Sequence, residues 1–204
     1  MTEIIMNQKE KISKIISALF FPMINTIIVF SLVIFLNKYN TPKENSYFFM
    51  LIILFFVVIP ILLMWIFKKF KMIKSFDVFE RQKRIIPFIF TIISYSLGFV
   101  ILLFTKDSPV FLKSMTLCYI INTVVILIVT IWWKMSVHAM AIAGPIVGLH
   151  YFFGNVILPF YLLIILVGYS RVVLKRHTIA QVIAGGLTGV LLTAVQMYFY
   201  LDLF

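Results

Sequence analysis

Acidic residues are scarce in this chain. Only seven of its 204 residues are Asp or Glu, against 18 Lys and Arg, and charged residues of both signs make up 12% of the sequence. Soluble domains carry about 25% charged and about 45–50% apolar residues, whereas 63% of this chain is hydrophobic. Seven carboxylates are too few for a surface that faces water. The composition therefore excludes a soluble globular protein and predicts an integral membrane protein.

Cysteine pairs and the common cofactor motifs are missing too. Cys118 is the single cysteine, so an intramolecular disulfide is excluded. The sequence has no glycine-rich phosphate loop, no HExxH motif and no cysteine-rich zinc pattern. Asp77 and Glu80 are the carboxylates nearest to the basic clusters described below, too few for a two-metal phosphatase site. We therefore expect neither a metal nor another cofactor.

Long apolar runs fill most of the chain. A helix needs roughly 20 apolar residues to cross a bilayer core. The candidate spans are Ile15–Leu36, Tyr47–Phe67, Ile85–Phe104, Val110–Trp133, Val137–Phe153, Val156–Tyr169 and Thr178–Leu201. We expect an all-α fold, a polytopic membrane helix bundle with six to seven transmembrane helices. The sequence shows no soluble domain or repeat, so residues 1–204 are expected to form one integral membrane domain.

The fifth and sixth runs are short and predict a hairpin. His138 and Arg171 are 33 residues apart, which is about 50 Å in a straight helix and overshoots the bilayer core. A tight turn at Gly154-Asn155 brings the polar ends of the two runs back to one side. Seven crossings follow, or six if an early segment only lies in the membrane interface.

Three polar clusters then meet at one membrane surface. They are "KSFDVFERQKRIIP" (residues 74–87), "WKMSVHA" (133–139) and "SRVVLKRHTIAQ" (170–181). Cations neutralise the charge on phosphoryl oxygens, and an imidazole with a pKa near 6.5 can attack phosphorus or protonate a leaving alkoxide. The clusters therefore predict metal-free phosphoryl transfer. Nucleic acid is not an expected partner, because most basic residues lie within a few residues of an apolar run.

Two of these clusters resemble signatures of the type 2 phosphatidic acid phosphatase family, which shares its core with vanadium haloperoxidases. The third family signature is Ser-Arg, five residues, His, three residues, Asp. Here the same spacing joins Ser170-Arg171, His177 and Gln181. The second signature is Pro-Ser-Gly-His, and Met135-Ser136-Val137-His138 keeps its serine and histidine.

The first cluster resembles the family's first signature, which is Lys, six residues, Arg-Pro. Lys74 and Arg81 have this spacing, although Gln82 replaces the proline, while Arg84 precedes Pro87 by three residues. The three motifs occur in the family's order, and the motif-bearing core covers about residues 74–201. The resemblance is to a compact bacterial branch and implies that family's helix bundle.

The resemblance also implies roles for individual residues. His177 is the expected nucleophile, which forms a phosphohistidine, and His138 is the expected acid for the leaving group. In the family, an aspartate at the position of Gln181 orients the nucleophilic histidine. The expected phosphate-binding residues are Arg171, Ser136, Ser170, Lys74 and one or both of Arg81 and Arg84.

The implied substrate is an amphiphile with a phosphate monoester or diphosphate, either a phosphatidate-type lipid or a polyprenyl phosphate. The implied setting is the inner (cell) membrane of a bacterium, among membrane lipids. The side of the membrane that the site faces and the oligomeric state stay open.

Gln181 leaves two functions open. Its amide oxygen can accept a hydrogen bond from His177 Nδ1, four residues away on the same helix face, but it offers no negative charge to an imidazolium. The chain is therefore either an active phosphatase or an impaired relative that binds or transports lipid phosphates.

Overall fold

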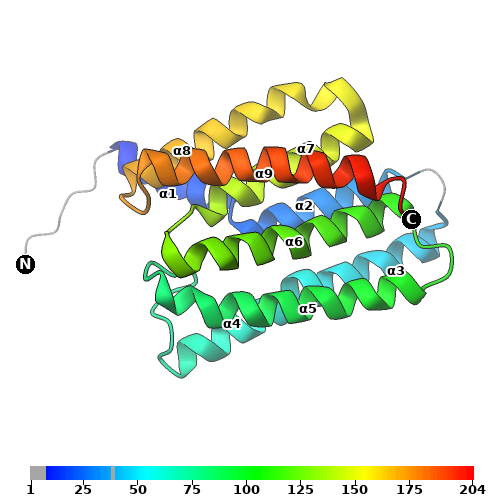
Figure 1. Ribbon diagram of the computed structural model, residues 1–204, viewed down its shortest axis with the longest axis horizontal. Helices are drawn as coiled ribbons and strands as arrows, with labels where there is room; N and C mark the ends of the chain where they lie inside the picture. Colours follow the sequence, from blue (N-terminus) through cyan, green and yellow to red (C-terminus); the bar gives the residue numbers. More distant parts are fainter. Residues whose placement is uncertain (1–7, 38–39) are drawn as a thin grey trace, which may run out of the picture.

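The computed structural model describes residues 8–37 and 40–204, and these residues form helices and no strand (Figure 1). The α-helices are α1 (Gln8–Leu19), α2 (Pro22–Phe35), α3 (Pro42–Ile53), α4 (Ile59–Lys69), α5 (Ile85–Phe104), α6 (Val110–Trp132), α7 (Val137–Phe153), α8 (Leu162–Val173) and α9 (Ile179–Tyr200). Three other helical segments join them: the π-helix η1 (Leu54–Val58) and the 3-10 helices η2 (Gln82–Arg84) and η3 (Gly154–Tyr161). The all-α prediction is confirmed.

Five helical segments of the described chain are long and apolar enough to cross a membrane, and a bent pair makes a sixth. The five are Pro42–Lys69, Gln82–Phe104, Val110–Trp132, Val137–Val173 and Ile179–Tyr200, and the pair is α1–α2, bent by 48°. They support the prediction of a membrane protein. The count of six takes Val137–Val173 as one segment. The sequence prediction takes its two halves as separate spans, which gives seven.

The segment Val137–Val173 folds back on itself, as the sequence predicts. Helix α7 ends at Phe153, and Gly154 has φ of 71°, a conformation that glycine adopts without strain. Figure 1 shows α7 and α8 running side by side from this turn. Both ring nitrogens of His150 lie 3.2 Å from partners across the turn, Tyr161 Oη and Asn155 Oδ1. His150 therefore has a structural role, because it closes the hairpin.

Glycines let α7 and α9 pack tightly. A Cβ on Gly185 would lie 2.5 Å from Ser136 O, and one on Gly189 would lie 2.9 Å from Met140 O. Real Cβ atoms do not approach backbone so closely, so larger residues would push the two helices apart. Small residues four positions apart in the sequence, Gly144 and Gly148 and likewise Gly185 and Gly189, predict this close packing of the fifth and last spans. The prediction is confirmed, and the contact brings together the start of α7, which carries His138, and the turn with His177.

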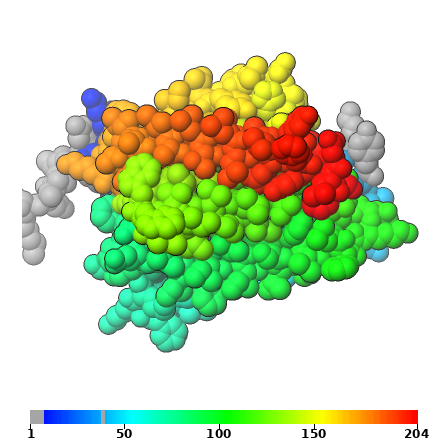
Figure 2. All heavy atoms as spheres, viewed as in Figure 1, coloured from blue at the N-terminus to red at the C-terminus, as the bar shows by residue number. Residues whose placement is uncertain are grey.

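Helix α9 lies at the surface of the bundle (Figure 2), and its outer side is apolar. Its exposed large residues recur every four positions: Ile179, Ile183, Leu187, Leu191 and Val195. Such a stripe suits contact with lipid tails rather than water.

The three polar clusters lie at one end of the bundle. In Figure 1 the segment between α4 and η2, the α6–α7 turn and the α8–α9 turn all lie at the end where α1 begins. The α5–α6 connection and the turn at Gly154 lie at the opposite end. This arrangement agrees with the sequence prediction of a common surface.

Candidate active site

The starts of α7 and α9 are tied together directly. Ser136 is the N-cap of α7, and its hydroxyl oxygen accepts a hydrogen bond from Ala139 N at 3.4 Å. Ser136 N donates in turn to Gln181 O at 3.1 Å. This backbone bond and the glycine contact beneath it set the positions of both histidine-bearing turns.

His177 is held by the cap of α9. Its Nδ1 lies 3.1 Å from Gln181 Oε1, the contact that the spacing predicts. Thr178 and Gln181 form a capping box, in which Thr178 N donates to the same Gln181 Oε1 at 3.3 Å. Because an amide oxygen only accepts hydrogen bonds, Nδ1 carries the proton and Nε2 keeps its lone pair.

The surroundings keep His177 neutral. The residue is only 7% exposed. Burial, followed by the positive charges of Arg84 and Lys134, lowers the pKa of His177 to about 3. A neutral imidazole with a lone pair on Nε2 is the form that a nucleophile needs.

His138 lies in the first turn of α7 and is 5% exposed. Its ring packs edge-on against Phe21, with 5.6 Å between the ring centroids. His138 and His177 line the same inner cavity of about 180 Å³. The structure therefore brings together the two histidines, which are 39 positions apart in the sequence.

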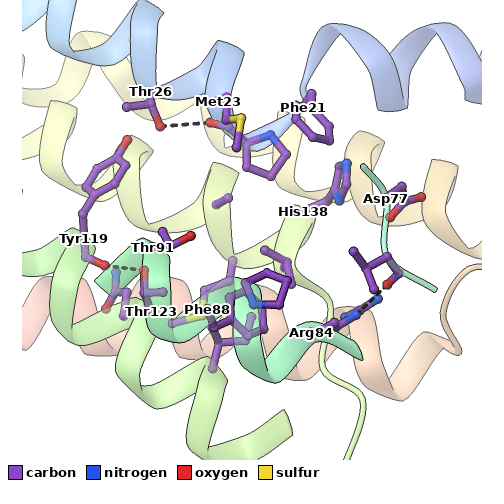
Figure 3. Close-up of a pocket in the computed structure, with 18 of the residues that line it drawn as sticks. Phe21, Met23, Thr26, Asp77, Arg84, Phe88, Thr91, Tyr119, Thr123 and His138 are labelled. Atoms are coloured by element: carbon purple, nitrogen blue, oxygen red, sulfur yellow. Dashed lines mark hydrogen bonds between the residues drawn. The ribbon is translucent and has the colours of Figure 1, made fainter. Parts of the chain in front are cut away.

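The inner cavity runs from the histidines into the bundle (Figure 3). In that view His138 and Arg84 lie at one end, while Tyr119, Thr123 and Thr26 lie toward the other. Apolar residues make up much of the lining: Phe21, Pro22, Met23, Met64, Phe76, Val78, Pro87, Phe88, Ile126, Val137, Met140, Ala141 and Pro145. An engineered apolar cavity of about 150 Å³ binds benzene, so this one can hold a short apolar segment of a ligand.

The first motif leaves open whether Arg81 or Arg84 belongs to the site, and the structure distinguishes them. Arg84 is 6% exposed, lines the inner cavity and donates from Nε to Val78 O at 2.7 Å. Arg81 instead donates to Thr130 O at 3.1 Å and to Ile131 O. These carbonyls belong to the last turn of α6, where helix oxygens lack intrahelical partners. Arg84 is thus the arginine beside the histidines, and Arg81 caps a helix.

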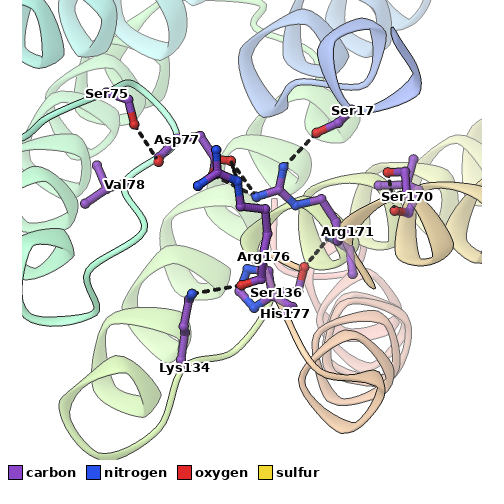
Figure 4. A network of polar contacts seen from close by, with 12 residues as sticks. Ser17, Ser75, Asp77, Val78, Lys134, Ser136, Ser170, Arg171, Arg176 and His177 are labelled. Carbon is purple, nitrogen blue, oxygen red and sulfur yellow. Dashed lines mark hydrogen bonds and ion pairs between the residues drawn. The ribbon is translucent and has the colours of Figure 1, made fainter. Parts of the chain in front are cut away.

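Arg171 is buried at the junction of α8, α1 and the 70–81 segment (Figure 4). Its side chain is 2% exposed. Arg171 Nη2 donates to both oxygens of Asp77, at 2.8 and 2.7 Å, and Nη1 donates to Ser17 Oγ at 2.7 Å. Arg176 Nε lies 3.6 Å from the same Asp77 carboxylate. The predicted phosphate ligand Arg171 therefore pairs with an internal anion.

An outer cavity of about 580 Å³ lies beside Arg171. It is lined by Glu10, Lys14, Ser17, Ala18, Phe21, Ser75, Phe76, Asp77, His138, Arg171, Val173, Leu174, Lys175 and Arg176. Phe21, Phe76, Asp77 and His138 line both cavities and so form the wall between them.

The cations of this region outnumber its carboxylates. Burial and then the charge of Arg84 lower the pKa of Lys134 to about 8. Lys134 Nζ lies 3.6 Å from the ring centroid of Phe79 and donates to Arg176 O at 2.8 Å. Such crowding of positive charge favours the binding of an anion.

Two predicted phosphate-binding residues lie elsewhere. Lys74 has a side chain that is 83% exposed and pairs with Glu80 at 3.2 Å. Ser170 is fully buried within α8, and its hydroxyl donates to Val167 O at 2.7 Å. Neither residue lines the cavity that holds the two histidines.

Three residues of the site, Asp77, Arg176 and Ser17, are not among those that the sequence motifs predict. Asp77 stands out in the sequence only as one of two carboxylates near the basic clusters, and Arg176 lies in the spacer of the third motif. The sequence contains one signal for Asp77. Acidic residues are scarce in this chain, so one that lies inside a basic cluster is a candidate partner for the cations there.

Among the described residues, no group of three or more His, Cys, Asp or Glu side chains is placed to hold a metal ion. Comparison of the chain with protein-family models, with curated proteins and with solved structures gives no match.

Proposed function

We propose that the protein is a membrane phosphatase that hydrolyses the phosphate monoester or diphosphate of an amphiphile through a phosphohistidine, without a metal. The observation that carries this proposal is the convergence of His138, His177 and Arg84 on one cavity, with Arg171 next to His138. The setting we propose is a bacterial cell membrane, and the substrate a phosphatidate-type lipid or a polyprenyl phosphate.

The chemistry follows from the protonation of the two rings. Nε2 of neutral His177 attacks phosphorus, the N–P bond forms and the bond to the leaving oxygen breaks. His138, as an imidazolium, gives its proton to that oxygen. Water then attacks the phosphohistidine, His138 takes a proton from the water, and the N–P bond breaks to release phosphate. A bound dianion next to His138 favours the imidazolium that the first step requires.

The apolar lining supports an amphiphile rather than a small water-soluble phosphate. The inner cavity leads away from the basic residues between the helices, so a ligand with its phosphate near Arg84 and Arg171 can place an apolar segment there. Burial of that segment adds about 25 cal/mol per Å² of apolar surface to binding.

Phosphate release by the purified full-length protein tests the proposal. In a phosphate-free maltoside detergent, phosphatidic acid and polyprenyl diphosphate are offered as substrates. We expect release that the His177→Ala variant loses by at least about a thousandfold, while the His150→Ala variant, altered in the hairpin turn, keeps it. Equal release by wild type and His177→Ala would rule out the proposed nucleophile.

The hydrogen bond between His177 and Gln181 favours one second candidate, a lipid-phosphate binder without turnover. A neutral amide orients the ring but gives no charge to an imidazolium, and a carboxylate-to-amide change in a serine-protease triad costs about 10⁴ in rate. Lipid binding without phosphate release, in both wild type and Gln181→Asp, supports this candidate. Release that rises in Gln181→Asp supports the enzyme.

A further inference from the structure

Asp77 stands where a phosphate would have to bind. Its two oxygens accept hydrogen bonds from Arg171 Nη2, and Ser17 Oγ accepts one from Arg171 Nη1. Arg171 Nε has no partner among the residues that the structure describes. A phosphate can therefore not use the two-pronged face of this guanidinium unless the carboxylate leaves it.

Asp77 also stands in the wall between the two cavities. It is one of the four residues that line both of them. Its segment, residues 70–81, contains turns and bends rather than regular helix, and Ser75 Oγ donates to Asp77 O at 2.8 Å within it. The ion pair with Arg171 thus holds an irregular segment of the chain in place between the two cavities.

The carboxylate is held in its charged form. Burial alone would raise the pKa of Asp77, but the charge and hydrogen bond of Arg171, helped by His138 and Arg176, lower it below its usual value. At neutral pH, Asp77 and a phosphate therefore compete as anions for the same donors.

We propose that Asp77 is an internal anion that closes the site by pairing with Arg171, and that the phosphate of an incoming ligand displaces it and opens the wall between the cavities. The proposal rests on the proposed function in that Arg171 binds the substrate's phosphate. A protein whose binding-competent form is only a fraction of the population binds its ligand more weakly by that fraction. Asp77 therefore lowers the affinity for every anion that uses Arg171.

This competition has a specific signature. If Asp77 must leave before any anion binds, its removal raises the affinities for a monoanion and a dianion by the same factor. If Asp77 stayed in place and only repelled ligands through space, its removal would help the dianion by roughly the square of the factor for the monoanion. Equal factors therefore identify displacement.

The experiment measures binding to the purified protein in maltoside detergent at mildly alkaline pH. The two probes are inorganic phosphate, which is mostly a dianion there, and dimethyl phosphate, a monoanion. We expect Asp77→Asn to bind both about tenfold more tightly than wild type, in keeping with the strength of a partly buried charged hydrogen bond. Glu80→Gln removes the same charge from the same segment but does not contact Arg171, so we expect it to leave both affinities unchanged. Phosphatidic acid, tested in a His177→Ala background that prevents turnover, shows whether the lipid gains the same factor as free phosphate.

If Asp77→Asn does not fold, two further measurements replace it. One uses a second charge-removing variant, Asp77→Ser, and the other uses the wild type. In the wild type, hydrogen exchange of backbone amides in residues 75–79 should rise when phosphate is added, because the segment loses its anchor. Unchanged affinities in the variants, unequal factors for the two anions, or unchanged exchange would each overturn the proposal. None of these readouts requires turnover, so loss of phosphatase activity alone would contradict the proposed function and leave Asp77 displacement standing.

Discussion

At the scale of single residues, Gln181 Oε1 connects helix capping to the chemistry of the site. It accepts the bond from Thr178 N that completes the cap of α9, and it faces His177 Nδ1. The cap therefore determines which nitrogen of His177 carries the proton. A helix end that is stable for local reasons thus presents a nucleophile in the required tautomer.

The depressed pKa of His177 predicts a specific loss of stability in acid. Between its folded pKa of about 3 and its unfolded value near 6.5, the unfolded ring binds a proton that the folded ring does not. Stability from this group is therefore complete above pH 6.5 and falls as the pH drops toward 3. At pH 5 the loss is about 2 kcal/mol.

Differential scanning fluorimetry in detergent checks this. We expect the apparent Tm of wild type to fall more between pH 7 and pH 5 than that of His177→Asn, which has no titrating ring. An identical fall in the two proteins would mean that His177 is not buried as a neutral imidazole.

Arg81 and Arg84 form a matched pair, because the same substitution has different predicted effects at the two positions. Arg84→Gln removes a charge beside the histidines and should lower kcat/KM by about 10²-fold. Arg81→Gln removes a cap on α6, so it should lower stability by about 1 kcal/mol and leave kcat/KM within about threefold of wild type. Steady-state kinetics and thermal unfolding of both variants measure this, and a larger kinetic effect of Arg81→Gln would place the wrong arginine in the site.

At the scale of helices, the contact between α7 and α9 sets the distance between the two histidine-bearing turns. Gly185 faces the backbone oxygen of Ser136, whereas a Cβ on the neighbouring Gly186 would lie 3.2 Å from Cγ2 in the side chain of Ile164. The two glycines therefore differ in what a methyl group would displace, since backbone cannot move aside and a side chain can.

Gly185→Ala should consequently impair activity more than Gly186→Ala. We expect a loss of at least about tenfold in kcat for Gly185→Ala, since small displacements of catalytic groups cost up to about 10²-fold. Gly186→Ala should stay within about threefold of wild type. The same assay of phosphate release measures both, and equal effects would show that the α7–α9 distance does not control the chemistry.

At the scale of the whole molecule, the sequence predicted much of the arrangement. The hairpin followed from a run too long for the bilayer, and the contact of α7 with α9 followed from the spacing of small residues. Both are consequences of local geometry. Ser17 could not be predicted, because α1 is a short polar helix and its periodicity does not reveal which helix its serines contact.

The choice between Arg81 and Arg84 could not be made from the sequence for the same reason. Arg81 has the motif's spacing from Lys74 but no proline after it, whereas Arg84 lacks that spacing but precedes Pro87 by three residues. Only the position of the α6 carboxyl end, 50 residues away from Arg81 in the sequence, separates the two arginines. Contacts of long, flexible side chains depend on where distant backbone lies, which a linear pattern does not contain.

The common location of the three clusters predicts a labelling pattern. In a Cys118→Ala background, single cysteines at Ser75 and Lys175 should react with a membrane-impermeant reagent from the same side. A cysteine at Asp107, in the α5–α6 connection at the other end of the bundle, should react from the opposite side. Labelling of positions 75 and 175 from opposite sides would contradict the helix arrangement.

If His177 and His138 act on one phosphate, as we propose, a phosphohistidine forms at His177 and can be trapped. The protein is mixed with substrate labelled in its terminal phosphate, quenched rapidly in alkali, in which phosphohistidine survives, and mapped by peptide. We expect label on His177 that accumulates while substrate lasts and is absent from His177→Ala. Phosphate release with label on no residue, or on a residue other than His177, would contradict it.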